Sequence, residues 1–332
     1  MRRAYFVHAR AALAALTLAA VTTIVASPHA AAQTPAYPSR PVKLVLPFGP
    51  AGSTDVIARL LAKSVGESWG QQIIIENKPG ADGDLGAEAV ARATADGYTL
   101  LLTTQALVVN ASLKAKRAYK TEDLAPIMLV AQTQAVLSVP AASPATSVKE
   151  LIAMAKAAPG KLDYGSAGVG TSGHLAIELF RLTTGIDVVH IPFRNIGQWM
   201  TDLIAGRIAL GMPTVPGATT HIRSGKIKPL GVSGKTRTKA LPEVPTVAEA
   251  GVPGYEATTW YALFAPRGTS EAIIARVNAA FRAALDQPEV NTRLIDIGVE
   301  PIPTSPAELG NHVASEAARW GKVIAEANIT AE

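Results

Sequence analysis

The sequence predicts an α/β fold, because short apolar runs alternate with helical patterns along most of the chain. The runs at 42–46 and 72–76 are apolar almost throughout, which is typical of strands covered on both faces. The same rhythm resumes after residue 136. This alternation and the turn residues between the runs favour a largely parallel sheet.

The first half of the chain is expected to hold three strands and two helices, joined by loops with turn residues such as Asp96-Gly97. A glycine-containing loop at 47–52 leads to a helix that opens at Ser53. The predicted strands are 42–46, 72–76 and 98–103, and the second predicted helix is 85–93.

The second half repeats the pattern and ends in two long helices. Ser147 with Glu150 three residues later predicts a capping box. The stretch 235–255 is rich in proline and glycine and is expected to be an ordered crossing segment. The predicted strands are 136–139, 162–165, 188–191 and 208–212, and the predicted helices are 147–157, 174–183, 199–205, 270–285 and 306–327.

The N-terminus has the pattern of a secretory signal peptide. Arg2, Arg3 and Arg10 precede an apolar run at 11–25, and small residues end in Ala30-Ala31-Ala32. We expect residues 1–32 to be a signal peptide cleaved after Ala32, which places the mature chain in the periplasm. The alternative is a membrane anchor, but the run is shorter than the roughly 20 residues of a comfortable span.

Composition excludes several functions. Removing the three arginines of the acid-free leader lowers the formal net charge from +5 to +2, too small for a nucleic-acid footprint. The chain has no cysteine, which excludes disulfides and thiol catalysis. The histidines of the mature chain show no metal-ligand spacing, so we expect no metal and no other cofactor.

A glycine-rich run at 168–173, GVGTSG, matches the dinucleotide fingerprint G-x-G-x-x-G between a strand and a helix. This leaves open a periplasmic or nucleotide-dependent enzyme, in which Arg194 would meet a 2′-phosphate. One observation argues against such an enzyme. The acid that binds the ribose should follow the next strand, at its carboxyl end, but Asp187 precedes that strand. Free N–H groups at a helix N-terminus bind any anion, so a carboxylate fits this loop as well as a phosphate.

The loop at 47–55 is a second candidate anion-binding loop, because it also leads into the start of a helix. Gly49, Ala51 and Gly52 allow close backbone approach, and Ser53 offers a hydroxyl at a helix start. The alternative is an ordinary turn between a strand and a helix. Two anion-ready loops in separate halves favour a shared ligand.

Other residues invite catalytic or pocket roles. His174 has no acid beside it in the sequence to orient its ring, and Ser172 lacks the G-x-S-x-G elbow, so we expect no catalytic residue. Trp260-Tyr261 is either a pocket wall or core. A purely structural or interaction protein is the third class considered.

An ordered set of motifs resembles the solute receptors of tripartite tricarboxylate transporters, often called Bug receptors. The set covers essentially the whole mature chain. The motifs are Tyr37-Pro38-Ser39-Arg40-Pro41, Pro47-Phe48 with Gly52-Ser53-Thr54-Asp55, Glu76-Asn77-Lys78-Pro79-Gly80-Ala81, Gly86-Ala87-Glu88, Asp96-Gly97-Tyr98-Thr99-Leu100, Gly170-Thr171-Ser172-Gly173-His174-Leu175 and Pro245-Thr246-Val247-Ala248-Glu249-Ala250-Gly251.

The resemblance implies a two-lobed type II periplasmic binding fold with a ligand cleft between the lobes. One lobe would be formed by 33–136 with 235–332, and the other by 137–234. It implies a monomeric receptor, not an enzyme, that captures a small carboxylate for the membrane permease of such a transporter. No nucleic acid is involved.

The resemblance also implies ligand contacts at the carboxyl ends of strands in both lobes. In the first lobe these are Phe48, Gly49, Ala51, Gly52, Ser53, Asp55, Thr104 and Gln105. In the second lobe they are Gly170, Thr171, Ser172, His174, Phe193 and Arg194, to which we add Trp199 and Pro213 from neighbouring segments.

Departures from the family pattern bear on the ligand. Ala209 stands where an aspartate is common, and Gln198 and Trp199 replace small residues. Burying an ammonium group without an anionic partner is unfavourable. We therefore expect a non-amino carboxylate, with aromatic acids and dicarboxylates as candidates. The alternative is that Trp199 packs into the lobe and Ala209 has no bearing on the ligand.

Overall fold

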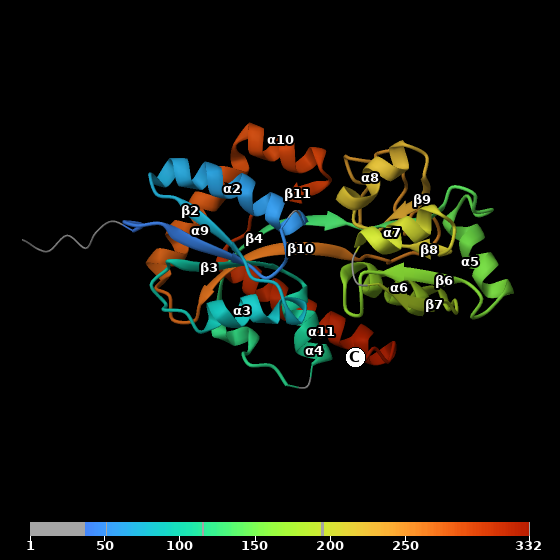
Figure 1. Cartoon of the computed structure of the whole chain (residues 1–332), viewed down its shortest axis with the longest axis horizontal. Coiled ribbons are helices and arrows are strands. Elements are labelled where there is room, and N and C mark those ends of the chain that lie inside the picture. Colours follow the sequence, from blue (N-terminus) through green and yellow to red (C-terminus); the bar gives the residue numbers. More distant parts are fainter. Residues whose placement is uncertain (1–36, 51, 115, 194–195, 332) are drawn as a thin grey trace, which may run out of the picture. The chain divides into compact units, whose positions relative to one another are not determined.

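The computed structural model describes residues 37–50, 52–114, 116–193 and 196–331. Residues 40–332 form one compact unit, separate from residues 1–39. The predicted signal peptide at 1–32 lies outside the described residues. Within the larger unit, the elements from residues 42–134 and 258–326 gather around one sheet and those from 136–232 around another (Figure 1).

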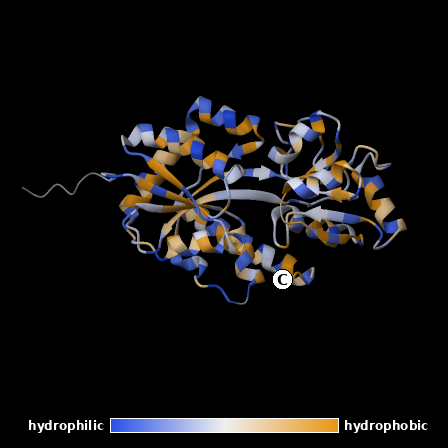
Figure 2. Ribbon diagram, in the orientation of Figure 1, coloured by the Kyte–Doolittle hydropathy of each residue, from blue (hydrophilic) through white to orange (hydrophobic). Residues whose placement is uncertain are grey.

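The first sheet has six strands in the order β11-β4-β10-β3-β1-β2. β1 pairs in parallel with β2 and β3, whereas β10 pairs antiparallel with β3 and β4. Its apolar side chains form the core, and Figure 2 shows the hydrophobic colour concentrated on these strands. The strands are β1 (Val42–Leu46), β2 (Ile73–Asn77), β3 (Thr99–Thr104), β4 (Leu124–Gln134), β10 (Thr258–Pro266) and β11 (Val299–Pro301).

The second sheet has five strands in the order β7-β6-β8-β5-β9. β6 pairs in parallel with β7 and β8, and β5 pairs antiparallel with β8 and β9. The strands are β5 (Val136–Pro140), β6 (Asp163–Ser166), β7 (Val189–Pro192), β8 (Leu210–Gly211) and β9 (Ile227–Val232). The α/β architecture in two sheets is the predicted one, while the predicted lobe bounds stay a prediction.

The expectation of largely parallel pairing is wrong. Both sheets are mixed, because the chain crosses from the first sheet to the second after β4 and returns as β10. The returning strand enters the first sheet from the opposite direction, so it lies antiparallel to its neighbours. Every residue of β10 except its first is buried, which hides the alternating pattern that marks a half-exposed strand.

The helices cover the sheets and carry their polar residues outward. None of the described helices is both long and apolar enough to span a membrane. The helices are α2 (Ser53–Trp69), α3 (Asp84–Ala91), α4 (Ala106–Leu113), α5 (Val148–Ala157), α6 (Ser172–Thr184), α7 (Ile196–Ile204), α8 (Val215–Arg223), α9 (Glu271–Asp286), α10 (Pro288–Asp296) and α11 (Pro306–Glu326), with short 3-10 turns η1 (Ala81–Gly83) and η2 (Thr121–Asp123).

The predicted cap of α5 is confirmed in part. Ser147 accepts a hydrogen bond from the backbone N–H of Glu150. The strongest hydrogen bonds of the Glu150 carboxylate come from the backbone N–H and hydroxyl of Thr146, one residue before the N-cap.

Between β9 and β10 the chain lies along the second sheet as an ordered connection. The N–H of Val247 donates to the carbonyl of Val232, and the hydroxyl of Tyr255 donates to the carbonyl of Ala176. This agrees with the ordered crossing segment expected from its proline and glycine content.

A buried carboxylate fixes α11 to the first sheet. Glu316 accepts hydrogen bonds from the indole N–H groups of Trp260 at 3.2 Å and Trp320 at 2.9 Å, and both rings are fully buried. Arg319 lies 3.2 Å from the other carboxylate oxygen and supplies the counter-charge.

Glu316→Ala is expected to lower the free energy of unfolding by about 3 kcal/mol, because two buried indole donors lose their acceptor. Urea denaturation followed by tryptophan fluorescence measures this loss. The exposed Glu326→Ala on the same helix is the control and should change stability by less than about 0.5 kcal/mol. Equal effects of the two substitutions would contradict the assignment.

Candidate functional site

A cavity of about 390 Å³ opens where strand ends of the two sheets approach each other. Its wall combines apolar surface from Phe48, Trp199 and Met212 with hydroxyl and backbone groups at helix starts. A more open groove of about 570 Å³ runs along α2 and β2, lined mainly by long polar side chains and small residues. The smaller cavity is the candidate site, because polar groups from both sheets converge on it.

The structure brings most of the predicted contact residues to this cavity. Ten of them line it: Phe48, Gly52, Ser53, Thr104, Gln105, Gly170, Thr171, Ser172, Trp199 and Pro213. Gly49, Asp55 and His174 are not among its lining residues, and Phe193 lines an adjoining pocket. Ala51 and Arg194 lie outside the described residues. That any of these residues contacts a ligand stays a prediction.

Asp55 has a structural role in the described chain. Its side chain is buried and accepts two hydrogen bonds from Arg59, at 2.8 and 3.0 Å. Asn77 at the end of β2 adds a third hydrogen bond at 3.1 Å and also bonds the carbonyl of Phe48. Asp55 therefore holds the loop before α2 against β2 instead of facing the cavity.

Three helices that begin at the cavity lack capping side chains at their described N-caps. At the N-caps of α2, α6 and α8, residues Gly52, Thr171 and Thr214 make no side-chain cap hydrogen bond. Ser147, Ser270 and Ser305, the N-caps of α5, α9 and α11, do make that bond, and none of them lines the cavity. The uncapped starts thus turn free N–H donors and the positive ends of helix dipoles toward the cavity.

α4 also begins at the cavity, but one of its first backbone N–H groups has an acceptor. Its N-cap residue Gln105 gives no side-chain cap, but the Thr104 hydroxyl accepts from the N–H of Ala106 at 3.3 Å. Its first turn therefore has fewer free donors than the first turn of α6.

Glycines shape the loop before α6. Gly168 and Gly170 have φ values of 121° and 77°, which favour glycine over residues with a Cβ. A Cβ on Gly173 would lie 2.8 Å from the carbonyl oxygen of Met212. The start of α6 therefore packs backbone to backbone against the end of β8.

Hydroxyl groups at the two main helix starts differ in their freedom to donate. Tyr261 donates to Ser53 at 2.8 Å, which leaves the Ser53 hydrogen available, and burial raises the pKa of Tyr261 to about 12. Thr171 donates to the carbonyl of Gly168 at 2.8 Å. The Ser172 hydroxyl has no hydrogen-bond partner among the described residues. Ser53 and Ser172 are thus hydroxyl donors that remain available to a ligand at the starts of α2 and α6.

Of the neighbouring residues Trp260 and Tyr261, one belongs to the core and the other to the pocket wall. Tyr261 lines the cavity, whereas Trp260 packs into the core beside α11. Adjacent residues of a strand point to opposite faces, so both interpretations apply, one to each residue.

Two buried polar atoms at the cavity lack partners. The described chain has three such side-chain atoms, and two of them are Gln105 Oε1 and Trp199 Nε1 on the cavity wall. The Trp199 ring fills the space beside Gly165 and Gly211, where an added Cβ would lie 3.3 and 2.6 Å from it. Trp199 is therefore both a core residue of the second sheet and part of the wall.

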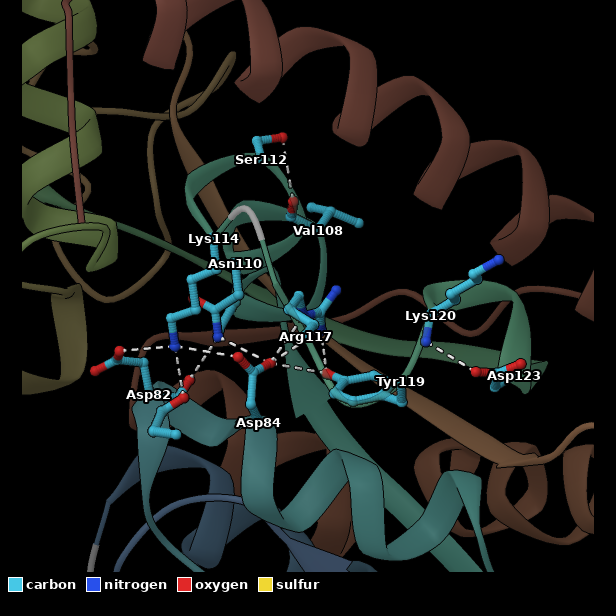
Figure 3. A network of polar contacts seen from close by, with 12 residues as sticks. Asp82, Asp84, Val108, Asn110, Ser112, Lys114, Arg117, Tyr119, Lys120 and Asp123 are labelled. Carbon is cyan, nitrogen blue, oxygen red and sulfur yellow. Dashed lines mark hydrogen bonds and ion pairs between the residues drawn. The ribbon is translucent and has the colours of Figure 1, made fainter.

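An ion-pair network supports the cavity from the first sheet (Figure 3). Asp84, the first residue of α3, lies 2.9 Å from Arg117 and 3.1 Å from Lys114, and Tyr119 donates to it at 3.0 Å. Burial raises the pKa of Asp84, but Arg117 and Lys114 more than offset it, so the pKa is lowered. Asn110 links the network to the cavity by donating to Asp84 and to the carbonyl of Asp82.

The cavity wall has little side-chain charge. Asp82 is the one charged residue among the described lining residues, and its carboxylate lies 3.0 Å from Lys114. Because Lys114 also pairs with Asp84, its charge is shared between two carboxylates. Attraction for an anion in the described wall therefore comes from backbone dipoles and hydroxyl groups rather than from a free cation.

His174 lies behind the loop, buried against His190, with Tyr164 farther away. Burial, followed by the charges of His190 and Arg181, lowers its pKa from 6.5 to about 3. A histidine held neutral in this way is a poor general base near neutral pH. The structure thus agrees with a packed residue.

This pKa predicts an acid-linked loss of stability. Between pH 6.5 and about 3 the unfolded chain protonates His174 while the folded chain does not, so the free energy of unfolding falls as pH falls. The slope from this group approaches about 1.4 kcal/mol per pH unit. Urea denaturation from pH 7.5 to 4.5 should show a shallower decline for His174→Asn than for the native chain, and parallel declines would contradict it.

The chain is similar to known proteins over most of its length. The family model "Tripartite tricarboxylate transporter family receptor" matches residues 57–329. BugT of Bordetella pertussis is 37% identical over 293 residues, covering 87% of this chain and 90% of that protein. A protein from the tcbD-tcbE intergenic region of Pseudomonas sp. strain P51 is 37% identical over 324 residues, covering 97% and 95%.

Solved structures give the same result. Rpa4515 of R. palustris with adipate has a TM-score of 0.81 and 37% identity, covering 89% of this chain and 99% of that one. MatC from Rhodopseudomonas palustris with bound malate has a TM-score of 0.76 and 33% identity, covering 87% and 100%. The resemblance found in the motifs is confirmed, and the enzyme alternative is set aside. The chain belongs to the tripartite tricarboxylate transporter receptor family, a family of periplasmic solute receptors rather than enzymes.

Proposed function

We propose that this receptor captures a small carboxylate in the periplasm and delivers it to the membrane permease of a tripartite tricarboxylate transporter. The observation that carries the proposal is the set of uncapped helix starts that open into one cavity from both sheets. Similar proteins with adipate and with malate bound support a carboxylate as the ligand class. The proposal includes a monomer whose leader is removed after Ala32.

A carboxylate suits these donors for a physical reason. It accepts several hydrogen bonds at once, and its charge is stabilised by the positive end of a helix dipole. Hydrogen bonds to a charged acceptor contribute about 1.5–3 kcal/mol each, more than those to a neutral group. The donors of α6 and the hydroxyl of Ser172 lie beside one sheet, while those of α2 and Ser53 lie beside the other.

A ligand that contacts both sets of donors favours a closed arrangement of the lobes. Its differential affinity for the closed state sets how far the equilibrium moves. A dicarboxylate with one acid group for each set uses both sets of donors.

The wall favours a non-amino ligand. An ammonium group requires an acidic partner, and the Asp82 carboxylate is already paired with Lys114. Ala209 is not among the lining residues, and its N–H donates to Asp163, so its identity bears less on the ligand than the sequence suggested. The apolar surface of Phe48, Trp199 and Met212 suits a flat or extended apolar body.

Thermal unfolding of the mature protein with adipate, malate, terephthalate and glutamate tests the proposal. A ligand that binds only the folded state adds about 2.7 kcal/mol of stability at one hundred times its Kd. We expect stabilisation by at least one non-amino carboxylate, with the compound recovered unchanged. Chemical turnover of a stabilising compound, or stabilisation by glutamate alone, would contradict the proposal.

Ser172→Ala should weaken binding of the carboxylate found in that screen by about 1–2 kcal/mol, because it removes a hydroxyl donor and leaves the backbone donors in place. Isothermal titration calorimetry measures the change. Thr183→Ala, near the C-terminal end of the same helix and exposed, is the matched control and should bind like the native protein. Native affinity in the Ser172 variant would place the anion elsewhere.

A further inference from the structure

Three aromatic rings form a stack behind the loop that precedes α6, with Tyr164 and His190 nearly parallel and His174 tilted by 40° from His190. The rings of Tyr164 and His190 lie 4.8 Å apart between centroids, and those of His190 and His174 lie 4.2 Å apart. Tyr164 and His190 are directly paired residues of the parallel strands β6 and β7, and His174 lies in the first turn of α6. The stack therefore ties two strands to the helix that begins at the cavity.

Each histidine holds a different part of the loop. His190 Nε2 lies 2.7 Å from the hydroxyl of Ser166, and that hydroxyl accepts from the N–H of Gly168 at 3.1 Å. His174 Nδ1 accepts from the N–H of Gly170 at 3.3 Å. Both glycines have positive φ, so without these hydrogen bonds the loop has many other conformations open to it.

The hydrogen bond to Gly170 fixes the protonation of His174. A backbone N–H is always a donor, so the ring nitrogen facing it carries no proton. A second proton on the ring would place two donors against each other. The charged groups near the stack among the described residues are Arg181 and Glu178, which pair with each other at 2.9 Å. Tyr164 donates to the same Glu178 at 2.5 Å and holds this carboxylate away from the histidines.

The loop that is held in this way forms part of the cavity wall. Ser166, Gly170 and Ser172 all line the cavity, whereas neither histidine does. The N–H of Gly170 is turned inward to His174, which fixes the backbone that leads into the first turn of α6. The histidines therefore act on the cavity only through the loop.

We propose that His174 and His190 are positioning residues that hold the loop 166–171 in the geometry that presents the amide donors of α6 to an anion. The proposal rests on the function proposed above. It assigns the histidine of the Gly-Thr-Ser-Gly-His run a role behind the site, without direct contact with the ligand. Its central requirement is an unprotonated ring nitrogen, or a substitute acceptor, at the position of His174 Nδ1.

The first test compares His174→Leu with His174→Asn. Leucine removes the acceptor, whereas asparagine places an oxygen close to the position of Nδ1. In the protein without ligand, amide hydrogen exchange measured by NMR should be about tenfold faster at Gly170 in the leucine variant and near native in the asparagine variant. His190→Leu and His190→Gln form the parallel pair for the Gly168 amide, since glutamine reaches the position of Nε2.

The second test measures adipate affinity by calorimetry in the same variants. We expect Kd to rise about tenfold for both leucine variants and to recover in the asparagine and glutamine variants. Phe180→Leu, a buried change on the same helix that touches neither histidine bond, controls for general destabilisation and should keep the native Kd.

Two outcomes overturn the proposal. One is native exchange at Gly170 and Gly168 in the leucine variants. The other is an asparagine variant as impaired as the leucine variant, which would show that ring shape matters and the acceptor does not. If the native protein binds no carboxylate, the proposed function fails, while the exchange measurements without ligand still decide whether the histidines hold the loop.

Discussion

Backbone N–H groups left without capping side chains are the constraint on which the site depends. A helix start leaves its first amides without internal acceptors, and most helices satisfy one of them with a serine or threonine side chain. α5, α9 and α11 do this through serine N-caps, whereas α2, α6 and α8 do not. The starts of α2, α6 and α8 lie at one cavity, where an anion can replace the missing cap, whereas the uncapped starts of α3 and α10 lie outside its lining.

The rest of the molecule supports those helix starts from behind. Tyr261 on β10 reaches the first residue of α2, and the buried Asp55, paired with the exposed Arg59, holds the loop before it. On the other sheet the histidine stack holds the loop before α6. Because β10 returns from the second sheet into the middle of the first, the scaffold that positions the two helix starts is continuous. Because helix amides and hydroxyl groups can hold the anion, the cavity wall needs few charged side chains, and its described part has one, Asp82.

The sequence predicts the parallel units well and the crossing strands poorly. Apolar runs with glycine turns identify strands such as β1 and β6, because the signal is local. β10 is buried on both faces, so it lacks the alternating pattern of a half-exposed strand, and it follows the irregular segment 235–255 rather than a helix. The hydrogen bond between Ser53 and Tyr261 joins residues 208 positions apart, and no local pattern predicts such a partner. The glycine loops were visible in the sequence, but the uncapped state of their helices is a property of three-dimensional geometry.

A crystal structure of the mature protein grown with a dicarboxylate that stabilises it would show directly which groups hold the anion. We expect carboxylate oxygens within about 3 Å of the first-turn amides of α6 or α2, with the hydroxyl of Ser172 or Ser53 as a further donor. We also expect the ligand to span groups from both sheets. Carboxylates found away from these helix starts would contradict the claim that uncapped helix amides bind the anion.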